Sequence, residues 1–196
     1  MKIIEIKIFA MLFYIGLSTS CASQSKGIGM NSTQTVQQEW IITEPFNKLW
    51  VDGDIEIFVS VKATQKVQVQ TNKNLMENLH MEVVEGQLRI KSNKKPNTNQ
   101  SIHIYIDLPI IKEISAHGNS VVRSMNAIMG DRLSLFTSQT SRINLYAEVE
   151  HLYLSSSSGS ELIVRGNTST CSSKSKGGGS IQKCGLSVGL PALTQR

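Results

Sequence analysis

Apolar and polar residues alternate along most of this chain from Trp40 onwards, with the two-residue period of a β-strand that is buried on one face. The clearest run is residues 101–108, SIHIYIDL, whose three isoleucines and final leucine share one face. Residues 54–61, DIEIFVSV, alternate in the same way. No long stretch has the 3.6-residue period of an amphipathic helix, and only residues 72–79, NKNLMENL, predict one or two helical turns. The pattern therefore predicts an all-β protein.

A repeat organises the C-terminal third of the sequence. Tracts of small polar residues are centred at Ser120, Ser141, Ser160 and Ser180, so that each follows the one before it at a nearly constant interval. Repeats of about 20 residues with strand periodicity are typical of coiled β structures, in which each turn buries its apolar face by stacking on the next. We predict a right-handed β-solenoid with coils of about 20 residues. The predicted inward-facing residues are Leu133, Leu135, Ile143, Leu145, Leu152, Leu154, Leu162, Val164 and Ile181.

The N-terminal half of the predicted domain contains two strong turn signals. Asp52-Gly53 and Glu85-Gly86 each lie between two alternating runs. Acidic-Gly pairs in this position favour the type I′ turn of a β-hairpin, because both central residues need positive φ. We therefore predict antiparallel hairpins at both sites, and we expect them to form the first coils or a cap.

Residues 1–22 have the pattern of an export signal. Two lysines precede an apolar run at residues 8–17, IFAMLFYIGL, which is too short to span a bilayer of ~30 Å. Two processing outcomes fit the small residues that follow: Cys21 becomes the lipidated N-terminus of a bacterial lipoprotein, or cleavage occurs after Ala22. The lipoprotein pattern is imperfect, because Ser18 stands where an apolar residue is usual. Residues 23–38 are rich in Ser, Gln and Gly and predict a flexible tether, so that residues 39–196 form a single β domain.

The charge of the chain bears on the class of partner that it can bind. The chain has 20 basic and 15 acidic side chains, with a net charge of +5. The basic residues are scattered and have no interleaved aromatic residues, so we predict no nucleic-acid partner.

If Cys21 is processed, Cys171 and Cys184 remain as a single pair. They could form a disulfide in an oxidising compartment, or serve as small apolar residues inside the coils.

No catalytic or cofactor-binding motif is present. The sequence has no Gly-x-Ser-x-Gly elbow, no HExxH motif and no P-loop, and its four histidines are widely separated. Asp52, Asp54 and Glu56 alternate and would share one face of a strand, but without a glycine-containing calcium loop we interpret them as solvated. We therefore predict no catalytic residue, no bound metal and no cofactor.

Aromatic side chains are the residues from which glycan binding would be built, because a sugar ring can stack on a flat aromatic face. The candidates are Trp40, Trp50, Tyr105, Tyr146 and Tyr153. We expect the two tryptophans to close the end of the core instead. The alternatives to a binding protein are an enzyme that acts on envelope polysaccharide from a β-helix scaffold, and a structural spacer.

The run IDLPIIKEISAHGNSVV at residues 106–122, followed by repeated Leu-x-Leu units and Gly-Ser corners, resembles a known family. Two corners carry the pattern, Ser158-Gly159-Ser160 and Gly178-Gly179-Ser180, whereas Gln139-Thr140-Ser141 departs from it. The chain is similar over residues 40–190 to the DUF2807 domain, the head GIN domain of auto-transporter adhesins, which is typical of Bacteroidetes envelope proteins.

The resemblance implies a β-solenoid-like fold, export to the outer membrane or periplasm, frequent lipid anchoring and no established enzymatic activity. It leads us to expect a non-enzymatic envelope protein that binds a surface glycan or protein through its outer faces. Family members continue for further turns after the last corner, so we also expect the chain to be truncated at its C-terminus, unless the tail forms a cap.

Overall fold

The computed structural model describes residues 35–93, 101–183 and 185–189, and these residues form an all-β unit with one short helix. All fourteen strands join one curled sheet. The elements are β1 Thr35–Trp40, β2 Lys48–Asp52, β3 Glu56–Val61, β4 Lys66–Asn72, α1 Lys73–Met76, β5 Leu79–Val84, β6 Gln87–Ser92, β7 His103–Leu108, β8 Glu113–His117, β9 Val121–Ser124, β10 Ile128–Thr137, β11 Arg142–Ser157, β12 Glu161–Lys176, β13 Ser180–Gln182 and β14 Leu186–Val188.

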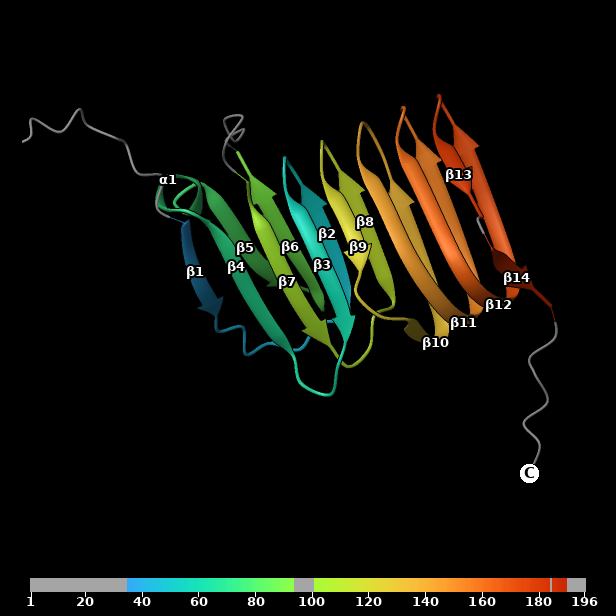
Figure 1. The fold of residues 1–196 in the computed structure, drawn as a ribbon, viewed down its shortest axis with the longest axis horizontal. Helices are drawn as coiled ribbons and strands as arrows, with labels where there is room; N and C mark the ends of the chain where they lie inside the picture. Colours follow the sequence, from blue (N-terminus) through green and yellow to red (C-terminus); the bar gives the residue numbers. More distant parts are fainter. Residues whose placement is uncertain (1–34, 94–100, 184, 190–196) are drawn as a thin grey trace, which may run out of the picture. The chain divides into compact units, whose positions relative to one another are not determined.

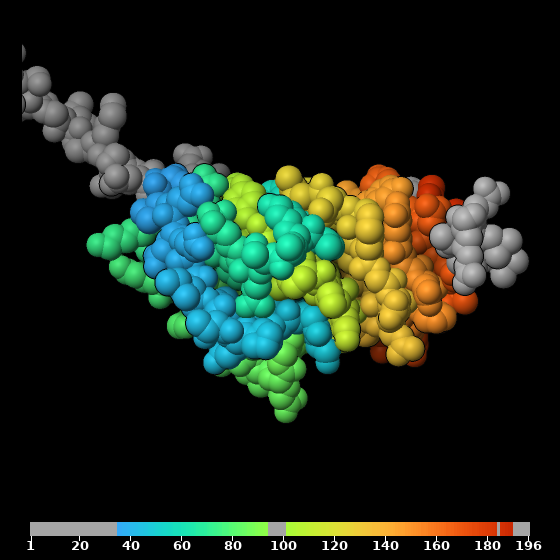
Figure 2. All heavy atoms as spheres, turned by 90° about the horizontal axis from the view of Figure 1, so that it is seen from below, coloured from blue at the N-terminus to red at the C-terminus, as the bar shows by residue number. Residues whose placement is uncertain are grey.

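The sheet curls because the chain alternates between two runs of parallel strands. One run contains β6, β2 and β8, and the other contains β7, β3 and β9. The long strands β10, β11 and β12 extend from the second run into the first. In Figure 1, β3, β7 and β9 lie in front of β2, β6 and β8, with the sheet continuous through the longer strands to the right. Figure 2 shows the yellow, orange and red segments following one another in chain order.

The registers of the C-terminal strands match the spacing of the sequence repeat. Glu113 pairs with Ser134, and Arg142 pairs with Glu161. Glu161 in turn pairs with Ser180. In each pair the second residue follows the first by one repeat of about 20 residues. Each repeat therefore lies in parallel register beside the next, as its small polar tracts predicted.

The small polar tracts form a column of tight corners. The amide nitrogen of Arg142 donates to the Ser120 carbonyl at 2.9 Å, and that of Glu161 donates to the Ser141 carbonyl at 3.0 Å. The residue two places before each corner serine has positive φ in all four corners: Gly118 (66°), Gln139 (61°), Ser158 (56°) and Gly178 (78°). Gln139 and Ser158 thus adopt a conformation that costs non-glycine residues energy. The departure at Gln139 changes the residue without changing the corner.

The core consists of aliphatic side chains from the inward faces of both runs. Eight of the nine predicted inward residues of the C-terminal third are buried, and Ile181 is partly buried. Ile102, Ile104, Ile106 and Leu108 of the SIHIYIDL run are also buried. Burial of each such side chain stabilises the fold by roughly 1.5–3 kcal/mol. The two-residue period therefore predicted the core correctly.

The prediction at Asp52-Gly53 was wrong, whereas the one at Glu85-Gly86 is confirmed. β5 and β6 are antiparallel, and Glu85 and Gly86 both have positive φ, at 51° and 71°. By contrast, β2 pairs with β6 and β8, and β3 pairs with β7 and β9. Gly53 lies at a corner where the chain passes from one run to the other. A tight turn does not specify a hairpin when each flanking strand finds parallel partners elsewhere.

The remaining boundaries differ slightly from those predicted. The predicted helical segment contains α1, which caps one end of the core with the buried Leu75. β1 begins at Thr35, inside the predicted tether of residues 23–38, and pairs antiparallel with β4.

Cys21, Cys184 and the predicted signal at residues 1–22 lie outside the described residues. Cys171 is partly buried and packs against the core. Within the described ranges, no helix has the length and apolarity needed to cross a membrane.

Candidate functional site

The sheet presents two outward faces, and their side chains are arranged differently. The Tyr105 face is the row of outward residues Gln68, Tyr105, Phe58, Arg123 and Asn144, with the neighbouring row that contains His103 and Glu56. The Trp50 face is the row Arg89, Trp50, Ser115, Phe136 and Ser155, with the neighbouring residues Lys91, His117 and Tyr153. Each row crosses the strands, because paired residues of neighbouring strands point to the same side.

The groups on the Tyr105 face mostly satisfy one another. Phe58 and Tyr105 stack with ring centroids 5.0 Å apart and an angle of 14° between their planes. Glu56 accepts from Arg123 Nε at 2.8 Å and lies 3.5 Å from His103 Nε2. The stacked rings cover one face of each other, and the charges are paired, so little of this chemistry is left for a ligand.

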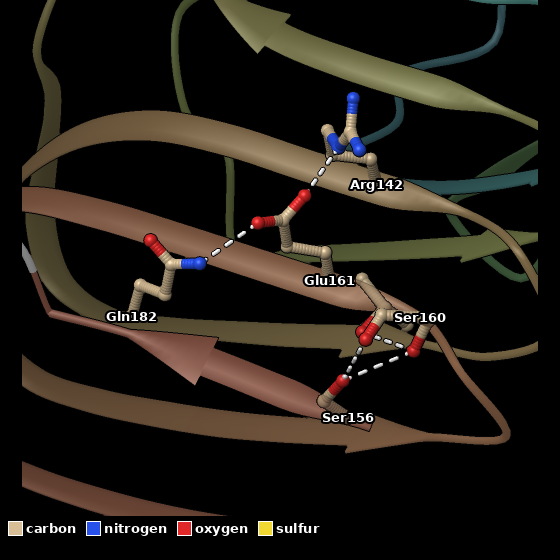
Figure 3. Close-up of polar contacts among 6 residues, drawn as sticks. Arg142, Ser156, Ser160, Glu161 and Gln182 are labelled. Atoms are coloured by element: carbon tan, nitrogen blue, oxygen red, sulfur yellow. Dashed lines mark hydrogen bonds and ion pairs between the residues drawn. The ribbon is translucent and has the colours of Figure 1, made fainter. Parts of the chain in front are cut away.

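A polar ladder extends the same face towards the C-terminus. Arg142 Nε donates to Glu161 Oε2 at 2.5 Å, and Gln182 Nε2 donates to Glu161 Oε1 at 2.9 Å (Figure 3). Arg165 donates to Asn144 Oδ1 at 2.9 Å. These contacts link successive repeats and use the polar atoms of this face internally.

The Trp50 face carries large aromatic rings beside small residues. Trp50 and Phe136 both flank Ser115 in register. Ser115 points outwards but is only 7% exposed, so its larger neighbours cover it. Tyr153 is 37% exposed, and its ring centroid lies 5.6 Å from that of Phe136. Trp50, Phe136 and Tyr153 therefore form an aromatic strip, which we define by these three residues.

His117 supports one end of this strip. Its ring centroid lies 5.3 Å from that of Trp50, with an angle of 36° between the planes. Its Nδ1 lies 2.7 Å from Ser138 Oγ, which belongs to the next corner. Burial lowers the pKa of His117 below its ordinary value of 6.5, and the negative charge of Asp52 opposes part of this effect. The ring is therefore mostly neutral at pH 7, when it packs against the indole.

A hollow of about 760 Å³ lies beside the strip. Leu79 and Met81 lie on the core side of β5, whereas His80 and Glu82 lie on its other side, so the hollow extends around this edge strand. Arg89 and Lys91 contribute its strongest positive charges. Its lining consists of Trp40, Trp50, Leu79, His80, Met81, Glu82, Gln87, Arg89 and Lys91.

The structure separates the five aromatic residues that the sequence suggested. Trp50 and Tyr153 lie on the Trp50 face, and Tyr105 and Tyr146 point outwards from strands of the other run. Trp40 packs against the end of the core as predicted, and its Nε1 is buried with no hydrogen-bond partner among the described residues. Trp50 does not close the core, because it points away from the buried Leu49 and Val51.

Sequence reasoning missed Phe136 and Arg89. Phe136 could have been found, because Leu133 and Leu135 alternate with it and must face the core. Nothing in the sequence places Arg89 beside Trp50, since that contact depends on the parallel pairing of β2 with β6.

The sequence suggested that Asp52, Asp54 and Glu56 share one face of a strand. In the structure they do not. Asp52 ends β2, Asp54 lies in the corner and Glu56 begins β3 on the other run. No group of three or more His, Cys, Asp or Glu side chains that could hold a metal occurs in the part of the chain that the structure describes.

Several solved structures share this fold at low sequence identity. A protein described as a putative adhesin from Bacteroides fragilis NCTC 9343 has a TM-score of 0.73 and 19% identity, covering 79% of this chain and 73% of that one. A putative adhesin from Parabacteroides merdae ATCC 43184 has a TM-score of 0.63 and 18% identity, covering 71% of this chain and 60% of that one. A protein from Parabacteroides distasonis ATCC 8503, described as a putative lipid binding protein, has a TM-score of 0.56 and 15% identity, covering 79% and 76%.

The family comparison agrees with the resemblance seen in the repeats. No protein of curated function matches the chain. The family model DUF2807, described as "Putative auto-transporter adhesin, head GIN domain", matches residues 45–189 and so includes both runs of the curled sheet. This match spans most of the sequence and includes Trp50, Arg89, Phe136 and Tyr153. The chain therefore belongs to the DUF2807 head GIN domain family.

Proposed function

We propose that this protein is a non-enzymatic binding protein of the cell envelope, which binds a surface glycan through the Trp50 face. The observation that supports this most directly is the aromatic strip of Trp50, Phe136 and Tyr153, which is supplied by three different strands. Flat aromatic rings beside small serines give a shallow platform on which sugar rings can stack. A surface protein is the alternative ligand, and it would use the same exposed rings.

The scaffold for this face is a β-solenoid with coils of about 20 residues. Two observations support this description: the parallel registers, in which each residue pairs with its counterpart in the next repeat, and the column of corner serines. In such a scaffold each outward row continues across successive strands. A ligand that is itself a repeating chain fits this surface better than a compact ligand does.

The non-enzymatic assignment rests on the arrangement of the acidic residues. Glycoside cleavage uses two carboxyl groups that flank the bond to be broken. Glu161, one of three glutamates in the C-terminal repeats, is in contact with Arg142 and Gln182. The aromatic strip of Trp50, Phe136 and Tyr153 contains no carboxyl group. Such a surface supports binding without bond cleavage.

The proposed location is supported by the N-terminal signal pattern and by the family. We propose export to the outer membrane or periplasm, with lipid anchoring at Cys21. Intact-mass measurement and membrane fractionation of the protein from its native host test this. A lipid-sized mass increase at a Cys21 N-terminus is expected, whereas a soluble species beginning at Ser23 would contradict lipid anchoring.

The binding proposal is tested by calorimetric titration of residues 23–196 with a panel of soluble bacterial and plant polysaccharides. We expect Trp50→Ala to weaken glycan binding at least about tenfold, because truncation of a central tryptophan commonly removes a dominant contact. Tyr105→Ala is the matched control, because it removes an outward ring from the opposite face.

Thermal unfolding of both variants separates folding defects from binding defects. Loss of binding in Tyr105→Ala but not in Trp50→Ala would move the site to the Tyr105 face. If the unmodified protein binds no glycan of the panel, the glycan proposal fails, and binding to a surface protein becomes the hypothesis to test.

A further inference from the structure

We propose that the glycan bound by the Trp50 face is an acidic polysaccharide, whose carboxylate groups enter the hollow beside Arg89 and Lys91. This inference rests on the proposed glycan binding and adds the chemical class of the ligand. The observation that supports it is that two cationic side chains, Arg89 and Lys91, lie beside the aromatic strip. Binding of a neutral sugar would not require cations there.

The charges that line the hollow favour an anion. Arg89 and Lys91 contribute two full positive charges, His80 adds an imidazole, and Glu82 contributes one negative charge. Arg89 and Lys91 have no ion pair among the described residues, whereas Lys62, Lys66, Arg123 and Arg142 each have one. An anionic ligand would therefore supply the ion-pair partner that neither Arg89 nor Lys91 has within the described part of the fold.

The guanidinium of Arg89 has donors available for such a group. Its Nε donates to Gln87 Oε1 at 3.2 Å, within the same strand. The remaining N–H groups of the guanidinium have no hydrogen-bond partner in the described part of the chain, and their fork geometry matches a carboxylate. Glu82 lies opposite Arg89 on β5, but the two side chains do not form an ion pair.

Arg89 lies at the correct place relative to Trp50. The two residues are in register on neighbouring parallel strands, which are about 4.8 Å apart. A sugar ring stacked on Trp50 would thus hold an equatorial carboxylate within reach of the Arg89 side chain. Lys91 lies two residues further along the same strand and faces the same side. Asp52 is in register with Lys91, but it does not line the hollow.

The aromatic strip gives the direction of the bound chain. Trp50 and Phe136 lie two strands apart, which is about 10 Å, and Tyr153 lies on the next strand. This distance exceeds the size of one sugar ring, so successive sugars would follow the strip across the strands. The hollow at the Arg89 end would then hold the acidic group of a terminal or internal uronic acid.

The experiment compares acidic glycans with neutral glycans of the same backbone. Three pairs serve as probes: polygalacturonate and its methyl ester, hyaluronan and its carboxyl-reduced form, and glucuronoxylan and its carboxyl-reduced form. We expect the acidic member of at least one pair to bind about tenfold more tightly, and we expect this preference to decrease between about 0.05 and about 0.5 M salt.

Arg89→Gln is the diagnostic variant, because it removes the charge and keeps most of the length of an exposed side chain. We expect it to abolish the preference for the acidic member, because the affinity for that member falls to about that for the neutral member. Arg165→Gln is the matched control, since Arg165 is exposed on the opposite face and donates to Asn144. Circular dichroism of both variants checks the fold.

Three outcomes are distinguishable. A preference for acidic glycans that Arg89→Gln removes and Arg165→Gln retains supports the inference. Equal binding of acidic and neutral partners, or a preference that survives Arg89→Gln, overturns the inference but leaves the proposed glycan binding intact. Absence of binding to every member of the three pairs and of the polysaccharide panel overturns both.

Discussion

Gly166 lies in register with Ala147 on the neighbouring strand, and the backbone of Ala147 leaves no room for a methyl group at position 166. A Cβ atom at Gly166 would lie 2.1 Å from the carbonyl oxygen of Ala147. The φ angle of Gly166 is also +116°, which residues with a side chain rarely adopt. Close packing of successive repeats therefore requires glycine at this position.

Gly166→Ala is expected to destabilise the protein by about 3–5 kcal/mol, because conformational strain and steric overlap add. Gly86→Ala is the control, since Gly86 also has positive φ, at +71°, but has no atom within 4 Å of its hypothetical Cβ. It should cost only about 1–2 kcal/mol. Urea unfolding measures both, and equal losses would show that the contact with Ala147 relaxes without cost.

The corner serines should contribute to stability through buried hydrogen bonds. Ser160 is 1% exposed, and its Oγ lies 2.7 Å from the Ser157 carbonyl oxygen and 2.9 Å from Thr137 Oγ1. Ser160 and its buried neighbour Ser156 appear together in Figure 3. Ser160→Ala leaves these groups without their partner, so we expect a loss of about 1–3 kcal/mol. Ser172→Ala, at an exposed position of β12, should change the free energy of unfolding by less than about 0.5 kcal/mol. Similar values for both variants would contradict a structural role for the column.

The charged ladder on the Tyr105 face should contribute much less than the buried serines. Side chains of Arg142 and Glu161 are 52% and 26% exposed. Exposed ion pairs are screened by water and salt and are commonly worth about 0–1 kcal/mol. Glu161→Gln is therefore expected to change the free energy of unfolding by less than about 1 kcal/mol in urea titrations. A loss larger than that of Ser160→Ala would show that the ladder, rather than the corner column, holds the repeats in register.

Much of the fold could be predicted because the alternation of apolar and polar residues is a property of the local sequence. Alternation fixes which side of a strand is buried, and it correctly assigned residues such as Ile104, Leu135 and Val164 to the core. The spacing of Ser120, Ser141 and Ser160 also predicted the parallel register, since one corner must lie beside the next. These features depend on residues that are near in sequence or that repeat.

The pairing of the N-terminal strands could not be predicted in this way. Asp52-Gly53 has the local sequence of a hairpin turn, yet β2 and β3 each find parallel partners that are far away in the sequence. The site depends on the same distant pairings. Trp50 and Phe136 flank Ser115 on one face only because β8 lies between β2 and β10. Sequence alone therefore predicts outward aromatic residues but not which of them share a face.

His117 should make the stability of the fold depend on pH. Burial lowers its pKa below the ordinary value of 6.5, so the unfolded chain takes up a proton at a higher pH than the folded chain does. Well above pH 6.5 the ring is neutral in both states and this contribution is complete. As the pH falls from 6.5 towards the lower pKa of the folded state, the unfolded state gains a proton first and stability is lost.

Urea unfolding of the unmodified protein and of His117→Asn, between about pH 5 and about pH 8, measures this effect as the difference between the two curves. We expect the unmodified protein to lose stability relative to His117→Asn as the pH falls below 6.5. His151→Asn is the matched control, since His151 is exposed and lies 2.8 Å from Thr170 Oγ1. A difference curve of opposite slope would mean that attraction to Asp52 outweighs burial.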